Sequence, residues 1–332
     1  MTETVFTYGN LLRAARKCMR GVGWKNSVIK WRENLPAYCL RLERELARGT
    51  FKWSAPVQMA IASPKPRMVN SLRFRDRVVQ RCMCDNGLYD DLTRGNDYDN
   101  GACQNGKGTA FSRGRLIRHL RRHWLKHGDK GWVLSLDVSR FFDSIPHGKL
   151  VNLVFQRVKS NRHRWMVRDL IRMGGKDGVG LDLGSPISQL LAVAYLTPVD
   201  YLCRHVAGVA GYVRYCDDII ALVPPVCVQP DGREVDGLTV ARNLRDKVAA
   251  ALGELGLALN PRSTIHPIRQ GVRFLGHRHT IKGGGRVVAK PLRDKLRRQR
   301  GRLRRMLAKG VPPDRIARHL AATHQHTTKE QR

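Results

Sequence analysis

The stretch YVRYCDDIIAL, residues 212–222, places two adjacent aspartates between two apolar runs rich in residues that favour β-strands. The pattern predicts a β-hairpin that turns at Asp217 and Asp218. Aspartate is a common turn residue, so a turn without any further role is the simplest explanation of the pair. The chain, however, has only 27 acidic residues against 61 lysines and arginines, and two of those acids stand side by side here.

A second apolar run, WVLSLDVSRFF at residues 132–142, also contains an aspartate at its end. Its alternation predicts a strand that closes at Asp137. If this strand and the hairpin are neighbours, three carboxylates converge, which is costly in a low-dielectric setting unless cations neutralise them. Carboxylate oxygens suit Mg²⁺, and two such ions can bind both the attacking and the leaving oxygen of a phosphoryl displacement. The pattern therefore predicts a site for nucleotidyl transfer.

Composition points to a polyanionic partner. The 332 residues carry a formal net charge of +34 and are 42% hydrophobic, which indicates a folded chain of two or three subdomains that binds nucleic acid. An anionic membrane surface is the rival partner, but no run of 18 apolar residues occurs and the first residues lack the apolar core of a signal peptide. The eight cysteines form no CxxC pair, so we expect reduced thiols in the cytoplasm.

Periodicity predicts a chain that mixes helices with strands, beginning with helices in residues 1 to about 60. The composition becomes strongly basic after residue 283, where we place a boundary. Helices are expected at 110–127 and 161–173, and a strand pair with a glycine turn in VRFLGHRHTIKGGGRVVAK. We find no internal repeat.

Four motifs in this order resemble those of reverse transcriptases. YCDD (215–218) looks like the YxDD box, LDVSRFFDSI (136–145) like the first palm motif, FRDRVVQ (74–80) like a fingers segment, and RFLGHRH (273–279) like the strand that leads to the thumb. The resemblance covers about residues 60 to 310. It implies an RNA-directed DNA polymerase with a right-hand α+β fold made of fingers, an antiparallel-sheet palm and a short helical thumb. On this resemblance, residues 1–131 would be N-terminal helices and fingers, residues 132–282 the palm with a fingers insertion at about 147–180, and residues 283–332 the basic helical thumb.

The resemblance also implies roles for particular residues. Asp137 and Asp217 would bind two Mg²⁺ ions, or Mn²⁺, with Asp218 beside them at the primer end. The backbone carbonyl of Val138 would complete a metal shell. Phe142 would be the steric gate, because a flat ring beneath the sugar collides with a 2′-hydroxyl; a core aromatic next to Phe141 is its alternative.

Cations of the fingers would bind the incoming triphosphate. Lys65 and Arg67 in SPKPR match these positions, and Arg73 or Arg75 are alternatives because the alignment there is loose. Where the family has a lysine pair after the sequence LALNP, this chain has Arg262, so we assign no proton-donating lysine.

The second palm motif reads LGSPISQ, residues 183–189, where most of the family has QGxxxSP. This variant resembles the diversity-generating retroelement branch, whose enzymes copy a template RNA, misincorporate opposite adenines and work with a basic accessory protein. Gly184 and Gln189 would lie at the nucleotide, and Leu183 cannot hydrogen-bond there as a glutamine does. An ordinary loop glycine before a helix is the alternative for Gly184. A group II intron-like or retron-like enzyme, and a non-catalytic RNA-binding relic, are the alternatives for the whole chain.

The basic tail predicts a surface that binds the template–primer backbone. Leu292, Leu296 and Leu303 form a helical stripe that we expect to pack on the palm. Contacts with phosphates are expected from four arginines on the same helix: Arg297, Arg298, Arg304 and Arg305. Such contacts give affinity without sequence preference, and binding should fall steeply with salt.

Several histidines recur at metal-ligand spacing without supporting acids. His119, His123 and His127 are four residues apart, but arginines surround them in the sequence, so we expect a solvated basic face rather than a zinc site. The same interpretation is given to the pairs 277/279 and 324/326. The sequence GACQNGKG nearly matches a phosphate-binding loop, but it lacks the following serine or threonine and the preceding strand.

Overall fold

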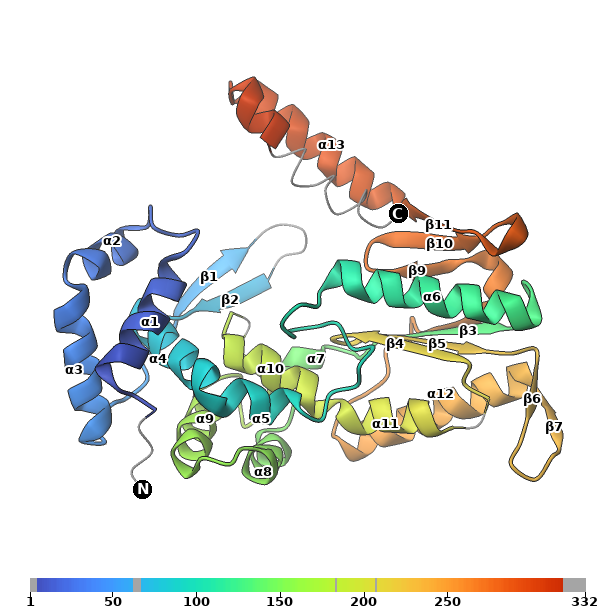
Figure 1. Cartoon of the computed structure of the whole chain (residues 1–332), viewed down its shortest axis with the longest axis horizontal. Helices are drawn as coiled ribbons and strands as arrows, with labels where there is room; N and C mark the ends of the chain where they lie inside the picture. Colours follow the sequence, from blue (N-terminus) through green and yellow to red (C-terminus); the bar gives the residue numbers. More distant parts are fainter. Residues whose placement is uncertain (1–4, 62–66, 183, 207, 319–332) are drawn as a thin grey trace. The chain divides into compact units, whose positions relative to one another are not determined.

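The computed structural model describes residues 5–61, 67–182, 184–206 and 208–318. The fold combines helices with antiparallel sheets, which confirms the predicted α+β class (Figure 1). The chain divides into two compact units that alternate along the sequence. Unit 1 consists of residues 1–96, 140–197 and 255–257, and unit 2 of residues 97–139, 198–254 and 258–332. The predicted three-part division stays a prediction.

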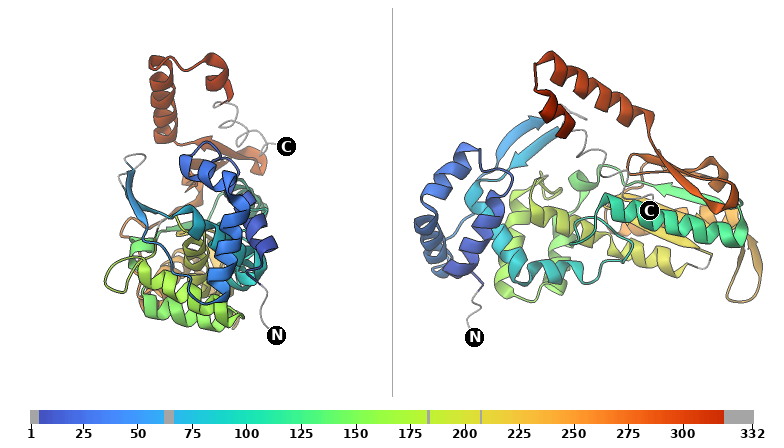
Figure 2. Two further views of the ribbon diagram at one scale, coloured as in Figure 1. Left: turned by 90° about the vertical axis from the view of Figure 1, so that its left-hand side faces the viewer. Right: turned by 45° about the horizontal axis from the view of Figure 1, so that its top comes forward.

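Unit 1 begins with three helices and a β-ribbon: α1 (Tyr8–Met19), α2 (Asn26–Glu33), α3 (Leu35–Ala47), β1 (Val57–Ile61) and β2 (Arg67–Ser71). Thr7 caps α1 by accepting a hydrogen bond from the Asn10 amide, as an N-cap threonine does. Helix α1 buries its apolar side against α3 and against α4 (Phe74–Met83), so these helices share one core (Figures 1 and 2).

The rest of unit 1 is helical: η1 (Cys84–Leu88), α5 (Tyr89–Thr93), α7 (Phe141–Ser144), α8 (His147–Arg157), α9 (Asn161–Met173) and α10 (Pro186–Tyr195). Helix α9 has the bounds that the sequence predicts. Ser160 caps α9 and Ser185 caps α10, each by accepting from an amide three residues ahead. Nearly all of α10 is buried, which agrees with its predominantly apolar sequence.

Unit 2 is built on a four-stranded antiparallel sheet in the order β4-β5-β3-β8. Its elements are α6 (Thr109–His127), β3 (Trp132–Leu136), α11 (Thr197–His205), β4 (Gly211–Tyr215), β5 (Asp218–Val223), β6 (Val226–Val228), β7 (Glu234–Asp236), α12 (Gly237–Glu254) and β8 (Thr264–Pro267). The expected hairpin is β4–β5, and β5 pairs with β3 as the acid pattern requires.

Helices cover both faces of this sheet. Helix α6 lies on one face and α12 on the other (Figure 1). Val133 and Leu134 of β3 are therefore both buried, although they point to opposite faces. The alternation in WVLSL correctly predicts a strand, but a central strand covered on two sides has no exposed face.

A second sheet follows, in the order β11-β10-β9. It consists of β9 (Val272–Phe274), β10 (His277–Ile281) and β11 (Val287–Pro291), with the short 3-10 turns η2 (Ile268–Gln270) and η3 (Gly283–Gly285) beside it. The expected strand pair is thus a set of three strands. The predicted part boundary at residue 283 falls within the β10–β11 connection. Phe274 and Val287 contribute to one core with Leu116 and Leu120 of α6.

Helix α13 (Arg293–Ala308) follows this sheet. The expectation that its leucine stripe packs is wrong for the described residues, because α13 has no buried side chain and Leu296 is exposed. Leu303 is only partly covered. None of the helices within the described ranges has the length and apolar character needed to span a bilayer.

Candidate active site

The β4–β5 hairpin turns over two residues. Tyr215 pairs with Asp218, so Cys216 and Asp217 form the turn. Cys216 has a φ of 60°, in the left-handed region that residues with a side chain seldom adopt. A two-residue hairpin needs positive φ at its first central position, which glycine usually supplies. The turn therefore holds a strained backbone next to both aspartates, and such strain persists only when the surroundings fix it.

The register of the sheet brings Asp137 to this hairpin. Leu136, the last residue of β3, pairs with Ile219 of β5. One further step along the same antiparallel register places Asp137 opposite Asp218. The neighbouring strands on which the spatial prediction depended are therefore present, and the shared site of the three aspartates stays a prediction.

The three carboxylates interact electrostatically. The pKa of Asp218 is raised to about 6, first because neighbouring protein atoms displace water from it and then because the charges of Asp217 and Asp137 repel its own. The Asp218 side chain still has an exposed surface. Water reaches it there, so the effect of burial is smaller than for an enclosed carboxyl, and the repulsion between like charges is the informative part of the shift.

The segment after α12 orients Asp137. The side-chain amide of Asn260 donates to the Asp137 carboxylate at 2.6 Å, and the Asn260 backbone amide donates to the Asp137 carbonyl at 2.8 Å. The Asp137 amide donates to the hydroxyl of Ser263 at 3.1 Å. Asp137 is thus held at both its backbone and its side chain, as a carboxylate that must keep one orientation requires.

The position of Val138 is compatible with its predicted role as a carbonyl ligand. Val138 forms an isolated antiparallel bridge with Leu259. The two hydrogen bonds of this bridge are made by Asp137 and Ser139, the residues on either side. In such a pair the carbonyl of the central residue points away from the opposite strand.

Whether these residues could hold a metal ion depends on the chemistry of their donor atoms. Carboxylate oxygens fit Mg²⁺, and a cation would relieve the repulsion that raises the pKa of Asp218. Among the described residues, however, no three histidine, cysteine, aspartate or glutamate side chains are gathered into a ready metal-binding group. The metal-ligand roles of Asp137, Val138, Asp217 and Asp218 therefore remain a prediction.

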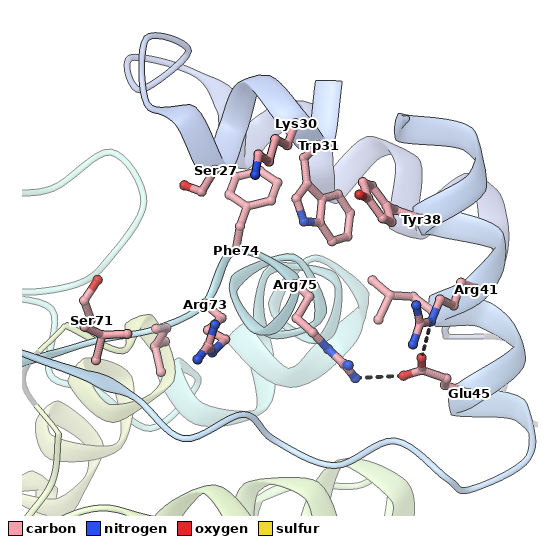
Figure 3. Close-up of a pocket in the computed structure, with 13 residues that line it drawn as sticks. Ser27, Lys30, Trp31, Tyr38, Arg41, Glu45, Ser71, Arg73, Phe74 and Arg75 are labelled. Atoms are coloured by element: carbon pink, nitrogen blue, oxygen red, sulfur yellow. Dashed lines mark hydrogen bonds and ion pairs between the residues drawn. The ribbon is translucent and has the colours of Figure 1, made fainter. Parts of the chain in front are cut away.

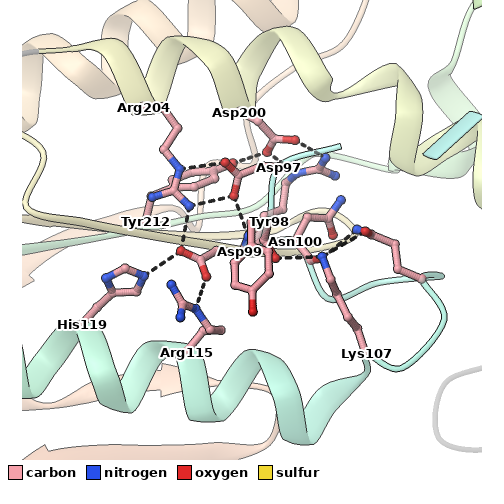
Figure 4. A network of polar contacts seen from close by, with 12 residues as sticks. Asp97, Tyr98, Asp99, Asn100, Lys107, Arg115, His119, Asp200, Arg204 and Tyr212 are labelled. Atoms are coloured by element: carbon pink, nitrogen blue, oxygen red, sulfur yellow. Dashed lines mark hydrogen bonds and ion pairs between the residues drawn. The ribbon is translucent and has the colours of Figure 1, made fainter. Parts of the chain in front are cut away.

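A buried ionic network connects strand β4 of the hairpin with helices α11 and α6 (Figure 4). The guanidinium of Arg214 in β4 is fully buried and binds the carboxylate of Asp200, at 2.6 Å through Nε and 2.5 Å through Nη2. Its Nη1 donates to the carbonyl of Cys216 in the turn, at 2.9 Å. The hydroxyl of Tyr212 donates to the same Asp200. One arginine therefore connects a buried acid in α11 to the strained turn.

A second acid extends this network towards α6. Asp99 is 2% exposed and binds His119 at 2.8 Å, Arg204 at 2.7 Å, and Arg115 (Figure 4). Burial alone would raise the pKa of Asp99, but the hydrogen bonds from these three partners outweigh burial and hold that pKa well below its usual range. The Asp99 carbonyl also accepts from the Arg214 amide at 3.3 Å, so the loop containing Asp99 runs along β4.

The predicted solvated basic face on α6 is wrong for two of its three histidines. His119 is buried against Asp99, and His123 is buried with its Nε2 at 2.7 Å from the carbonyl of Lys130. His277 and His279 are likewise buried in the β9–β11 sheet rather than solvated, and burial lowers the pKa of His279 to about 4. The pair 324/326 lies outside the described residues.

The predicted nucleotide-binding residues belong to unit 1. Phe142 on α7 is partly exposed, whereas Phe141 is buried and packs edge-on against it at 5.5 Å between ring centroids. Of this pair, Phe142 has the ring that can meet a ligand. Arg67 begins strand β2, and Lys65 lies outside the described residues.

Gly184 has a structural reason to be glycine. Its φ is +116°, and a β-carbon there would lie 2.9 Å from the carbonyl oxygen of Asn70 in β2. The close approach that this glycine permits is thus to another part of the protein. Gln189 is exposed on α10, and Leu183 lies outside the described residues. The motif is tied to the FRDRVVQ helix, because the Ser185 hydroxyl donates to the side-chain carbonyl of buried Gln80 at 3.0 Å.

The four arginines predicted to contact phosphates are exposed on α13. Arg297 lies 3.5 Å from Asp294, a pairing at the surface that leaves it accessible. Arg298 and Arg305 donate to backbone carbonyls one turn earlier. Their charge is therefore available to a ligand in solvent.

Comparison with protein families identifies the family of this chain. The family model described as reverse transcriptase (RNA-dependent DNA polymerase) matches residues 62–279, about two thirds of the chain.

The chain belongs to the reverse transcriptase family.

The four motifs by which the sequence resembles a reverse transcriptase all lie within the matched segment. Among curated proteins, an uncharacterized 91 kDa protein in the cob intron of Schizosaccharomyces pombe is 31% identical over 88 residues, which are 24% of this chain and 11% of that protein. The putative COX1/OXI3 intron 2 protein of Saccharomyces cerevisiae is 29% identical over 77 residues, which are 21% of this chain and 9% of that protein. The matches thus span only about a tenth of the length of these relatives.

Sequence reasoning missed the residues that support the reverse transcriptase hairpin. Arg214 carried one available signal, since it is a charged residue inside a strand predicted to be buried. Asp200, in the mostly apolar run that follows α10, carried a similar one. Nothing in the sequence pairs the two. Asn260 carried no signal beyond its place after the helix α12.

Proposed function

We propose that this chain is an RNA-directed DNA polymerase that makes cDNA on an RNA template. The observation that carries the proposal is the sheet register that sets Asp137 opposite Asp218, beside Asp217, in a member of the reverse transcriptase family. The reaction is attack of a primer 3′-hydroxyl on the α-phosphate of a dNTP, with pyrophosphate leaving. Its partners are an RNA template, a DNA or RNA primer, and dNTPs.

The three aspartates would hold two Mg²⁺ ions, with Mn²⁺ as a substitute, and the Val138 carbonyl would add one ligand. Bound there, the ions would activate the attacking hydroxyl and offset charge on the phosphates. The protein prepares this site in two ways. Asn260 fixes the orientation of the Asp137 carboxylate, and Arg214 fixes the turn that carries Asp217.

Other residues would select and hold substrates. The partly exposed ring of Phe142 would exclude a ribose 2′-hydroxyl. Lys65 and Arg67 would bind the triphosphate, with Gly184 and Gln189 at the nucleotide. The four exposed arginines of α13 would contact the template–primer backbone, as the net charge of +34 favours.

The test is primer extension on a homopolymer RNA with Mg²⁺. We expect Asp217→Asn to abolish dNTP incorporation while leaving RNA affinity nearly unchanged, because one carboxylate is replaced by an amide of the same size. Asp231→Asn, in the exposed β6–β7 loop, is the matched control and should retain full activity. Full synthesis by Asp217→Asn would refute the assignment. RNA binding without any synthesis by the unaltered protein would instead favour the non-catalytic relic.

Two branches of the family give different products. The LGSPISQ motif favours the error-prone enzyme of a diversity-generating retroelement, acting with a basic accessory protein. The similarity to two proteins named for introns favours a group II intron-like enzyme. Sequencing of cDNA made on a mixed RNA template separates them. The first proposal predicts errors concentrated opposite adenines, and the second predicts no such bias.

A further inference from the structure

Unit 1 contains a cavity of about 550 Å³ whose lining has none of the residues named in the proposed function, although it includes Arg73 and Arg75, the alternative cations for the triphosphate. Helices α2 and α3, the start of α4 and the ends of β1 and β2 line it (Figure 3). Cavities of about 300–1,000 Å³ are typical of small-ligand sites, so this one is large enough for a single nucleotide.

The cavity has an aromatic wall. Trp31 contacts Tyr38 at 4.8 Å and Phe74 at 5.1 Å between ring centroids. Phe74 is buried, whereas Trp31 and Tyr38 are each only partly covered. Rings that hold each other in place lose little conformational freedom when a flat ligand stacks on them, so the wall is prepared for such a ligand.

The cavity is also positively charged. Its lining contains four cations and one acid, Glu45. Glu45 pairs with Arg41 at 2.9 Å and Arg75 at 2.7 Å. The remaining two cations, Lys30 and Arg73, are exposed and form no ion pair with any other described residue. Both side chains are therefore available to attract an anion to the lining.

Two serine hydroxyls also belong to the lining. Ser27 and Ser71 lie on the same side of the cavity as Lys30 and Arg73 (Figure 3). A hydroxyl can both donate and accept a hydrogen bond, and can thus pair with a base edge or with a ribose 2′-hydroxyl.

We propose that this cavity binds one unpaired nucleotide of a single-stranded RNA. The base stacks on Trp31 and Tyr38, and the adjoining phosphates lie at Lys30 and Arg73. Aromatic stacking combined with a cationic rim is how proteins hold single strands. The proposal rests on the proposed function, because a polymerase that copies RNA must hold the unpaired template. It assigns a contact in unit 1 that is separate from the aspartates of unit 2.

The first test measures binding of a labelled, unstructured oligouridine RNA by fluorescence anisotropy. Tyr38→Leu should weaken binding roughly tenfold, the loss typical of one stacked base. Tyr38→Phe keeps the ring and should bind like the unaltered protein. Trp24→Leu is the matched control, because Trp24 is 75% exposed and lies outside the cavity lining. Urea unfolding of each variant confirms that the protein remains folded.

The second test measures the slope of log affinity against log salt concentration. Removing one cation that neutralises a phosphate of a single strand makes that slope shallower by roughly 0.7. Lys30→Gln and Arg73→Gln should each give such a decrease. Lys25→Gln, at the cation that lies over the ring of Trp24, should not.

Three probes distinguish a nucleotide within an RNA strand from one within DNA and from a free nucleotide. RNA should bind more tightly than the matching DNA oligonucleotide, and uridine monophosphate should compete only weakly. If Tyr38→Leu weakens binding of uridine monophosphate but not of RNA, the strand assignment is overturned. Unchanged RNA affinity in folded Tyr38→Leu overturns the site altogether. Loss of RNA affinity in this variant supports the site even if the unaltered protein makes no cDNA, so the two proposals can fail separately.

Discussion

Arg214 neutralises buried Asp200 and also binds the carbonyl of Cys216 in the turn, and replacing it by lysine separates these two roles. The arginine makes two hydrogen bonds with Asp200 and a third with the carbonyl of Cys216, all from one planar group. Lysine keeps the positive charge that neutralises buried Asp200, but its ammonium is a single point on a flexible stem and does not reproduce this fork. We expect Arg214→Lys to stay folded and to lose the hydrogen bond to the Cys216 carbonyl in the turn.

The size of the effect follows from that third contact. A hydrogen bond from a charged donor contributes about 1.5–3 kcal/mol. The left-handed conformation at Cys216 costs about 1–3 kcal/mol, a similar amount, so without the contact the turn is free to relax. If the relaxed turn is inactive, dNTP incorporation falls roughly 10- to 100-fold. Arg214→Leu is a poorer probe, because an unpaired buried Asp200 would cost about 3–5 kcal/mol of folding stability.

The assay is single-turnover incorporation at saturating primer–template, with urea unfolding measured on the same samples. Arg204→Lys is the matched control. Arg204 belongs to the same network through Asp97 and Asp99, and its side chain makes no hydrogen bond to the turn. It should lower stability and leave the rate unchanged. If folded Arg214→Lys incorporates dNTPs at the unaltered rate, Arg214 does not position the aspartates.

Three further predictions concern charge, sugar choice and salt. Because the folded pKa of Asp218, about 6, exceeds its ordinary value, the metal-free protein should lose stability as pH rises towards 6; Asp218→Asn should unfold at higher urea than the unaltered protein at pH 7 and at the same urea near pH 4. Phe142→Ala should admit ribonucleotides in primer extension, and unchanged sugar selectivity would identify another gate. Changing the four α13 arginines to glutamine should weaken template–primer binding for all sequences and flatten its salt dependence, and a loss confined to one sequence would contradict a backbone role.

The sheet at the candidate active site could be predicted because its signals are local. Alternating apolar residues mark β3, and an acid between two β-favouring runs marks the hairpin. The convergence of Asp137 and Asp218 then needs only one assumption, that the strands are neighbours. The family resemblance supplied the same pairing independently.

The support of the site could not be predicted, because its partners are far apart in sequence. Asp99 binds Arg204, which lies more than a hundred residues later in the sequence. Buried Asp99 also binds His119, so this histidine belongs to the core, although the sequence predicts it to be solvated. Charged residues are usually exposed, so a single sequence favours the wrong environment for each of these side chains. The leucine stripe of α13 failed for the opposite reason, since a helical period shows that a face is apolar but not that anything covers it.

The interleaving of the two units has a consequence for biosynthesis. Strand β3 leaves the ribosome about eighty residues before β5, its partner in the sheet, and β8 follows only after α12. During that interval the nascent chain holds an apolar strand with two unpaired edges while the helices of unit 1 are still being made. Folding of the four-stranded sheet must therefore wait for late translation, and a ribosome stalled before residue 218 would expose an unpaired strand to chaperones or to aggregation.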